Sequence, residues 1–336
     1  MRRRAWSLSN TWGCIPVALF ALTGFGVPEA ANAGGLNQFI GFGDSTMDSG
    51  YFRYQSTGGS PGAGGPGSAA ALDAAIARTV AAGGTGAFVG PGVVDTIQLA
   101  ARFGLLALPS TIPGGAGTNY ANGSAQTVST TAGNGYANGL YNNVPIVSQI
   151  SNYLAATHNV ANPNALYMIS FGGNDLTWLR TLGTSLSPQV YIQSLATALT
   201  AGVANLQAAG ARTIMVLNVY SYARVVGPGG IVAPADAIDV NEAATYSADV
   251  WSGLRAAGVN FIPADVEGVL KYVSQNPTRF GFSVATEFTS SPACGNTSSL
   301  VCGPSQLVAP NAEQTYLWSD PHHLTTAGQT IEADYI

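Results

Sequence analysis

Continuous apolar runs of strand length constrain the fold of this chain most strongly. Leu166–Phe171 and Thr213–Val219 are two such runs, Phe39–Phe42 is a shorter one that ends in a turn, and Val259–Ile262 is a further candidate. Apolar runs without polar alternation are typical of strands buried on both faces of a parallel sheet. The sequence therefore predicts a central parallel sheet.

Helical patterns lie between these runs. Ser187 and the proline after it read as an N-cap and a first helical residue, and Gly210 is a candidate C-cap for the same helix. A second helix is predicted over Asn241–Ala257, and a third from a cap at Thr325 towards Tyr335. Alternation of strands and helices predicts right-handed β-α-β units in a three-layer α/β/α fold.

The composition excludes several classes of protein. The chain has 336 residues, of which 46% are hydrophobic and only 9% charged, with a formal net charge of −5, so wholesale disorder is excluded. Lys271 is its single lysine, which argues against a nucleic-acid partner because phosphates require clustered basic residues. Glycine accounts for 42 residues, and the segment 56–67 is a low-complexity loop or insertion. Matches in that segment to G-x-S-x-G and G-x-G-x-x-G lack the strand and helix context that these motifs need.

The N-terminus has the pattern of a signal peptide. Arg2–Arg4 form a positive region, Cys14–Val27 is apolar, and Ala31–Ala33 supplies a small-x-small cleavage site. The apolar stretch is shorter than a membrane-spanning helix requires. We expect cleavage after Ala33, a secreted or cell-surface location, and a single mature domain over 34–336.

The remaining cysteines fit an oxidising compartment. Cys294 and Cys302 form an even pair, and no further metal ligands stand at zinc-site spacing around them. We expect a small disulfide loop that acts as a local staple without a catalytic role, and no metal site.

An acid–histidine pair near the C-terminus is a candidate for general base chemistry. Asp320 stands three residues before His323, on a turn that precedes a predicted helix, where a carboxylate could orient the imidazole ring. Taken alone, a solvated turn is the more frequent explanation of such a pair. His322 is a weaker competitor at a spacing of two, and His158 reads as a residue at a helix C-terminus.

Three further segments follow predicted strands or loops at positions where α/β sheets place their sites. Ser45 lies in Gly-Asp-Ser directly after the first apolar run, and Asn174 lies in Gly-Gly-Asn-Asp after the second. The small residues around Gly123 and Ser124 could present a backbone N–H to a substrate. Each segment alone is also consistent with an ordinary polar turn, and for the segment around Gly123 and Ser124 a plain polar loop is the more frequent explanation.

Together, and in this order, the four segments resemble the GDSL, or SGNH, family of esterases and lipases over nearly all of residues 36–336. The ending of the chain is similar to that of the passenger domains of bacterial autotransporter esterases. Those chains continue into a β-barrel, so we expect a free secreted form or a truncated one. The resemblance implies an SGNH-hydrolase fold, which is flavodoxin-like, and hydrolysis of acyl or lipid esters without a cofactor.

The same resemblance implies roles for individual residues. Ser45 would be the nucleophile of an acyl-enzyme mechanism, His323 the base and Asp320 its orienting partner. The oxyanion hole would consist of the Ser45 N–H, a backbone N–H of Gly123 or Ser124, and the Asn174 side chain. Two positions depart from the family pattern. Thr46 replaces the usual leucine, and Ser124 replaces the usual glycine, so the choice between Gly123 and Ser124 stays open.

A second hypothesis is a catalytically silent surface module that binds glycan or lipid on its aromatic and Asn-rich loops near 136–143. The presence of all four residues Ser45, Asn174, Asp320 and His323 argues against it, since a pure binder need not retain them. Ester hydrolysis by the wild type and by Ser45→Ala distinguishes the two hypotheses.

Overall fold

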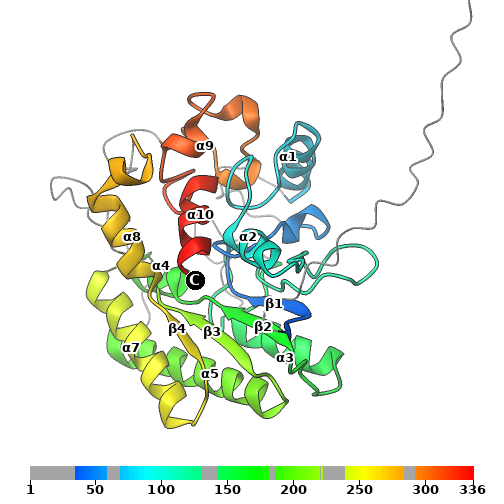
Figure 1. Cartoon of the computed structure of the whole chain (residues 1–336), viewed down its shortest axis with the longest axis vertical. Coiled ribbons are helices and arrows are strands. Elements are labelled where there is room, and N and C mark those ends of the chain that lie inside the picture. The colour runs from blue at the N-terminus through cyan, green and yellow to red at the C-terminus, as the bar shows by residue number, and fades with distance from the viewer. Residues whose placement is uncertain are drawn as a thin grey trace, which may run out of the picture. The chain divides into compact units, whose positions relative to one another are not determined.

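The apolar runs form the strands of a parallel sheet in the computed structural model of the chain (Figure 1). The strands are β1 (Gln38–Phe42), β2 (Ala165–Ile169), β3 (Thr213–Leu217) and β4 (Ile262–Ala264). In the described part of the chain they make one four-stranded sheet in the order β1-β2-β3-β4, and every pairing is parallel. The predicted parallel α/β architecture is confirmed.

The structure describes residues 35–58, 69–129, 142–181, 186–219, 221, 239–283 and 292–336. The expected signal peptide over 1–33 lies outside these residues, as do most of the glycine-rich segment 56–67 and most of the loop 136–143. Residues Asn32–Ile336 form one compact unit.

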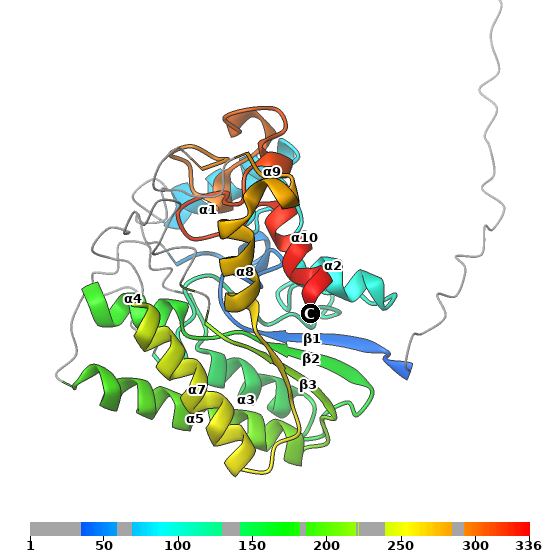
Figure 2. The same ribbon diagram turned by 60° about the vertical axis from the view of Figure 1, so that its left-hand side comes forward.

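Successive side chains of the central strands enter different cores, so the sheet is covered on both faces. In β2, Tyr167 and Ile169 belong to one buried cluster, whereas Leu166 and Met168 belong to another. The first cluster also includes Leu199 and other buried residues of the helices that cover one face of the sheet. Figure 2 shows α3, α5 and α7 on this side and α2, α8 and α10 on the other. This arrangement gives the three layers, and it explains why the strands lack polar alternation.

The helices have the following bounds: α1 Ala69–Ala81, α2 Asp95–Arg102, α3 Ile146–Ala156, α4 Gly173–Thr181, α5 Pro188–Ala208, α7 Val240–Ala256, α8 Val266–Gln275, α9 Ala312–Thr315 and α10 Thr326–Tyr335. Short 3₁₀ turns are η2 Tyr51–Arg53, η4 Pro277–Phe280, η5 Ser299–Val301 and η6 Pro304–Gln306.

The predicted helix ends are confirmed by their capping contacts. The Ser187 side chain accepts a hydrogen bond from the Val190 N–H, and Thr325 accepts one from the Gly328 N–H. Gly210 has a left-handed φ of 122° just after α5, a conformation that favours glycine.

The last strand was predicted too early. Only Ile262 of the predicted run Val259–Ile262 lies in β4. The Val259 N–H instead bonds the Leu254 carbonyl, and the turn at the end of α7 passes through Gly258 at a φ of 69°. Val259 is apolar because it packs in the core under this turn, not because it belongs to a strand.

A short extended segment continues the sheet beyond β1. Asn119 forms an isolated parallel bridge with Gly41. Counted with this segment, the spatial order becomes second-first-third-fourth-fifth, which is the flavodoxin-like order. The strand order then reverses between β1 and β2, and the carboxyl ends at such a switch point are where open α/β sheets bind their ligands.

Candidate active site

Ser45 lies at the carboxyl end of β1, on the turn that leaves this switch point. Gln149 of α3 holds the turn from below: its Oε1 accepts the Gly43 N–H and its Nε2 donates to the Gly43 carbonyl, both at 2.8 Å. A Cβ on Gly43 would lie 2.5 Å from Ser170 Oγ at the end of β2. A side chain at position 43 would have to displace Ser170, so glycine allows the two strand ends to approach each other closely.

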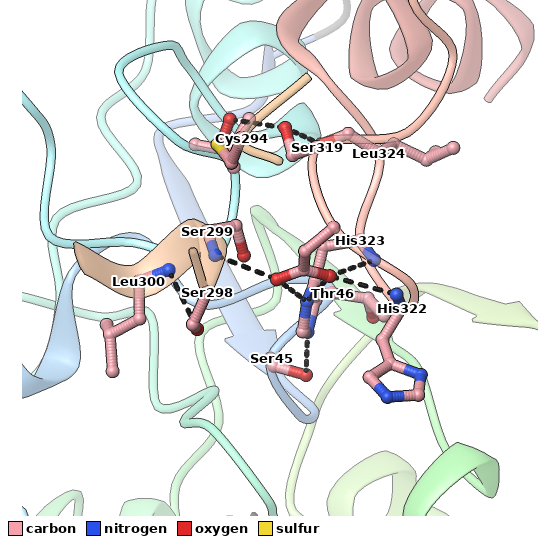
Figure 3. A network of polar contacts seen from close by, with 12 residues as sticks. Ser45, Thr46, Cys294, Ser298, Ser299, Leu300, Ser319, His322, His323 and Leu324 are labelled. Atoms are coloured by element: carbon pink, nitrogen blue, oxygen red, sulfur yellow. Dashed lines mark hydrogen bonds and ion pairs between the residues drawn. The ribbon is translucent and has the colours of Figure 1, made fainter. Parts of the chain in front are cut away.

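Ser45, His323 and Asp320 form a continuous chain of contacts. Figure 3 shows its first part, from Ser45 to the His323 ring. His323 Nε2 lies 2.8 Å from Ser45 Oγ. On the other side of the ring, His323 Nδ1 lies 2.8 Å from Asp320 Oδ1 and 3.0 Å from Oδ2. All three residues are buried. The structure thus brings Ser45 into contact with His323, although the two residues are 278 positions apart in the sequence.

The Asp320 carboxylate accepts hydrogen bonds from several backbone N–H groups. Its Oδ1 accepts the N–H groups of His322 and His323 at 2.9 and 3.0 Å, and its Oδ2 accepts the Ser299 N–H at 2.8 Å. Burial alone raises the pKa of Asp320, but the nearby His323 ring with its hydrogen bond, the His322 ring and the Ser299 hydrogen bond outweigh burial and hold the pKa well below its ordinary value. Asp320 is therefore ionised at neutral pH, as an orienting partner for His323 needs to be.

The disulfide loop contributes one of these hydrogen bonds to Asp320. Cys294 and Cys302 are bonded, as predicted, and the loop between them contains Ser299. The next residue, Leu300, packs in a buried cluster with Phe88, whose ring centre lies 4.9 Å from that of His323. The expectation that this loop is only a local staple is incomplete, because its backbone reaches Asp320. No sequence pattern marked Ser299, since its N–H acts on a residue from a distant part of the chain.

The residues predicted for an oxyanion hole lie around the same strand ends, but they are not equivalent. The Gly123 N–H donates to Asp48 Oδ2 at 3.0 Å, so its single hydrogen is engaged. Ser124 has a left-handed φ of 62°, which is uncommon for a residue other than glycine. The Asn174 Nδ2 donates to the Ala125 carbonyl at 3.0 Å. Of the two candidates in this segment, Gly123 is thus committed to another partner.

The two residues that differ from the family pattern, Thr46 and Ser124, each have a distinct local environment. Thr46 Oγ1 donates to Asp44 Oδ1 at 2.8 Å and lies 3.3 Å from Ser170 Oγ. Thr46 therefore adds a polar contact between the ends of β1 and β2. Ser124 occupies a backbone conformation that glycine adopts without steric cost, which explains why glycine is usual there.

Two buried carboxyl groups beside the site were not identified from the sequence. Asp48 and Asp175 are both fully buried, and burial is the largest influence on each: despite several hydrogen bonds it raises the pKa of each to about 7. Asp48 follows Ser45 by three residues, and Asp175 is the last residue of the Gly-Gly-Asn-Asp segment, next to Asn174. Their closeness to Ser45 and Asn174 in the sequence was the one indication that these two aspartates belong to the site. Their hydrogen-bond partners Gly123 and Thr127 are remote in sequence and could not be identified in this way.

The other two histidines do not contact Ser45 through their rings in the hydrogen bonds described above. His322 donates its backbone N–H to Asp320. His158 follows the C-terminal end of α3, as predicted, at a φ of 55°. Within the part of the chain that the structure describes, no cluster of three His, Cys, Asp or Glu residues is arranged to hold a metal ion. Among the same residues, no helix is long and apolar enough to cross a membrane.

A parallel α/β sheet with a histidine that contacts a serine on one side and an aspartate on the other, at its carboxyl edge, is an arrangement shared by several classes of hydrolase. The fold and the site therefore define the chain as a hydrolytic α/β enzyme.

The comparisons with known proteins make this class specific. The profile of the GDSL-like lipase/acylhydrolase family matches residues 39–336, and the chain belongs to this family. It is accordingly a carboxylic ester hydrolase. No curated protein matches the chain. A similar solved structure is LAE5, an alpha/beta hydrolase enzyme from the metagenome of Lake Arreo, Spain. It shares 15% sequence identity, with coverage of 89% of this chain and 92% of that chain and a TM-score of 0.40.

Proposed function

We propose that this esterase cleaves acyl or lipid esters in two steps through an acyl-enzyme on Ser45. The observation that carries the proposal is the contact chain from Ser45 Oγ through the His323 ring to the Asp320 carboxylate, with a serine–histidine distance of 2.8 Å. A nucleophile within hydrogen-bond reach of a base, which is itself oriented by a third group, is the arrangement that activates a serine.

In the first step, Ser45 Oγ attacks the ester carbonyl carbon while its proton passes to His323 Nε2. The tetrahedral intermediate collapses, the C–O bond to the alcohol breaks, and His323 returns the proton to the leaving alcohol. In the second step, His323 takes a proton from water, whose oxygen attacks the acyl carbon. Collapse of this second intermediate breaks the acyl bond to Ser45 Oγ, His323 returns its proton to that oxygen, and the acid is released. Asp320 stays ionised throughout and stabilises the imidazolium.

The proposed oxyanion donors are the Ser45 N–H, the Ser124 N–H and the Asn174 side-chain amide. Gly123 is excluded from the set because its N–H donates to Asp48. The Asn174 side-chain amide is held beside the segment that bears Ser124, because its Nδ2 donates to the Ala125 carbonyl at 3.0 Å. Removing one donor of an oxyanion hole typically costs about 2.7–4 kcal/mol of transition-state stabilisation.

The proposal includes export. The N-terminal sequence has the pattern of a signal peptide, and the Cys294–Cys302 disulfide suits an oxidising compartment. N-terminal sequencing of the protein recovered from the medium or cell surface tests this part. A mature chain that begins at Gly34 supports cleavage after Ala33, and an intact Met1 or an intracellular location contradicts it.

Hydrolysis of p-nitrophenyl esters by purified wild type and Ser45→Ala tests the chemistry. The wild type should release p-nitrophenol catalytically, and the variant should lose nearly all of this activity while its melting temperature stays close to that of the wild type. Equal activity of the two proteins would show that Ser45 is not the nucleophile. A series of acyl chain lengths then separates short-chain esterase from lipase activity.

A further inference from the structure

Asp48 connects the turn that bears Ser45 to the segment that bears Ser124. Its Oδ1 accepts the N–H groups of Gly50 and Tyr51 at 2.8 and 2.6 Å, both within its own turn. Its Oδ2 accepts the Gly123 N–H at 3.0 Å, 75 residues further along the chain. Both oxygens of this fully buried carboxyl group are thus used by backbone donors.

Asp175 makes the corresponding contact at the other end of the segment 123–127. Both of its oxygens lie 3.1 Å from the Thr127 nitrogen and accept that N–H. Its Oδ2 also accepts the Thr127 hydroxyl at 2.8 Å. The Tyr246 hydroxyl from α7 lies 2.6 Å from Thr127 Oγ1 and completes the buried network.

The residues between these two anchors are held by further bonds. The Ser124 carbonyl accepts Asn143 Nδ2 at 2.8 Å, and the Ala125 carbonyl accepts Asn174 Nδ2 at 3.0 Å. Ser124 itself keeps its left-handed backbone conformation. A non-glycine residue adopts such a conformation in a folded protein only where its surroundings fix it, and residues of this kind concentrate at functional sites.

We propose that Asp48 and Asp175 are positioning residues that clamp the two ends of segment 123–127 and so fix the oxyanion donors before the substrate binds. The proposal rests on the proposed function of Ser45, Ser124 and Asn174. Oxyanion donors stabilise a transition state because they need no reorganisation when the charge develops. A carboxyl group can serve as a clamp because its two oxygens accept several hydrogen bonds at once, as those of Asp48 and Asp175 do here.

The test exploits substrates that depend differently on the oxyanion hole. A thionoester carries sulfur in place of the carbonyl oxygen, and sulfur is larger and a weaker hydrogen-bond acceptor. The ratio of kcat for an oxygen ester to kcat for its matched thionoester therefore reports how well the donors are placed. A loss of folding or of nucleophile activity lowers both rates and leaves the ratio unchanged.

Asp48→Asn is the first variant. The amide keeps one oxygen for the donors of its own turn, but it sets an NH₂ group against the Gly123 N–H. We expect kcat for the oxygen ester to fall about tenfold to a hundredfold with little change in KM, and the ester-to-thionoester ratio to fall with it. Asp73→Asn is the matched control, because Asp73 also accepts a backbone N–H and a hydroxyl, from Thr57 and Ser56, but is only partly buried and lies on α1, outside segment 123–127. Its ratio should equal that of the wild type.

Thr127 provides a milder pair of variants at the other anchor, in case Asp48→Asn does not fold. Thr127→Val removes the hydroxyl bond to Asp175 and should lower the ratio, whereas Thr127→Ser keeps the hydroxyl and should restore it. A ratio that stays at the wild-type value in folded Asp48→Asn and in Thr127→Val overturns the clamp. Retained hydrolysis in Ser45→Ala would instead refute the proposed function, so the two failures are distinguishable.

Discussion

Removing the Cys294–Cys302 disulfide tests whether the loop that it closes supports the site or only the fold. The perturbation is the double variant Cys294→Ala/Cys302→Ala, in which alanine places no new polar group in the two buried positions. The bond spans a sequence separation of 8 residues. For a loop of this length, the chain-entropy relation gives a loss of about 2.6 kcal/mol in the free energy of unfolding.

Two consequences follow from the structure. For a domain of about 300 residues, the unfolding entropy near the melting temperature converts about 2.6 kcal/mol into a drop of about 4 °C. The second consequence concerns Asp320, which loses part of the support of the Ser299 N–H at 2.8 Å. A hydrogen bond to a charged group contributes about 1.5–3 kcal/mol when complete. A partial loss of about 1 kcal/mol corresponds to a decrease of about fivefold in kcat.

The assay combines a thermal melt with steady-state hydrolysis of a p-nitrophenyl ester well below the melting temperature. Asn296→Ala, on an exposed part of the same loop, is the control and should change neither quantity. If the melting temperature falls while kcat stays at the wild-type value, the loop is the local staple that the sequence suggested, and its role at Asp320 is refuted. If the melting temperature does not fall, the entropic argument is wrong.

Three further predictions follow from other contacts. Ser124→Gly should raise the free energy of unfolding by about 1 kcal/mol relative to Ser124→Ala, because glycine relieves the left-handed strain, and both variants should keep their ester hydrolysis since the backbone N–H remains. Asp320→Asn should lower kcat about 10⁴-fold, because an amide can stabilise the wrong tautomer of His323. Burial, with neighbouring Asp44, raises the pKa of Asp95 to about 7. Its unfolded value is about 3.9, so stability should fall as pH rises from about 4 to about 7, and Asp95→Asn should flatten that slope.

Each of these has a measurement that decides it. Urea denaturation compares the Ser124 variants, and equal midpoints would contradict the strain argument. Single-turnover kinetics compare Asp320→Asn with the wild type, and a loss below tenfold would remove Asp320 from its orienting role. Denaturation midpoints across this pH range test Asp95, whose raised pKa means that the folded state binds its proton more tightly. A slope that is the same in Asp95→Asn would assign the pH dependence to other groups.

The sequence predicted those parts of the fold that depend on local pattern. The first three strands are apolar because both faces of the sheet are covered, so their positions could be read directly. The position of β4 could not be predicted in the same way, because β4 is only three residues long and two of them, Ile262 and Pro263, are exposed. Val259 misled the prediction, since an apolar residue under a helix-ending turn looks the same as one in a strand.

The site was predictable where the family motifs name a residue and unpredictable where a partner comes from far along the chain. Ser45, His323 and Asp320 were identified in this way, and the structure brings them into contact. The engagement of Gly123 by Asp48, and of Asp320 by Ser299, depends on how distant backbone segments meet. Single-sequence patterns contain no information on such pairings, because any backbone N–H can serve.

The central claim is that Ser45 forms the covalent intermediate, and active-site labelling tests it most directly. The purified enzyme is treated with a p-nitrophenyl alkylphosphonate, residual activity is followed, and the modified position is mapped by peptide mass spectrometry. We predict one phosphonyl group per chain, on the peptide that contains Ser45, with loss of activity in proportion to labelling and no labelling of Ser45→Ala. Inactivation with the label on another residue, or full activity after stoichiometric labelling of Ser45, would contradict the account.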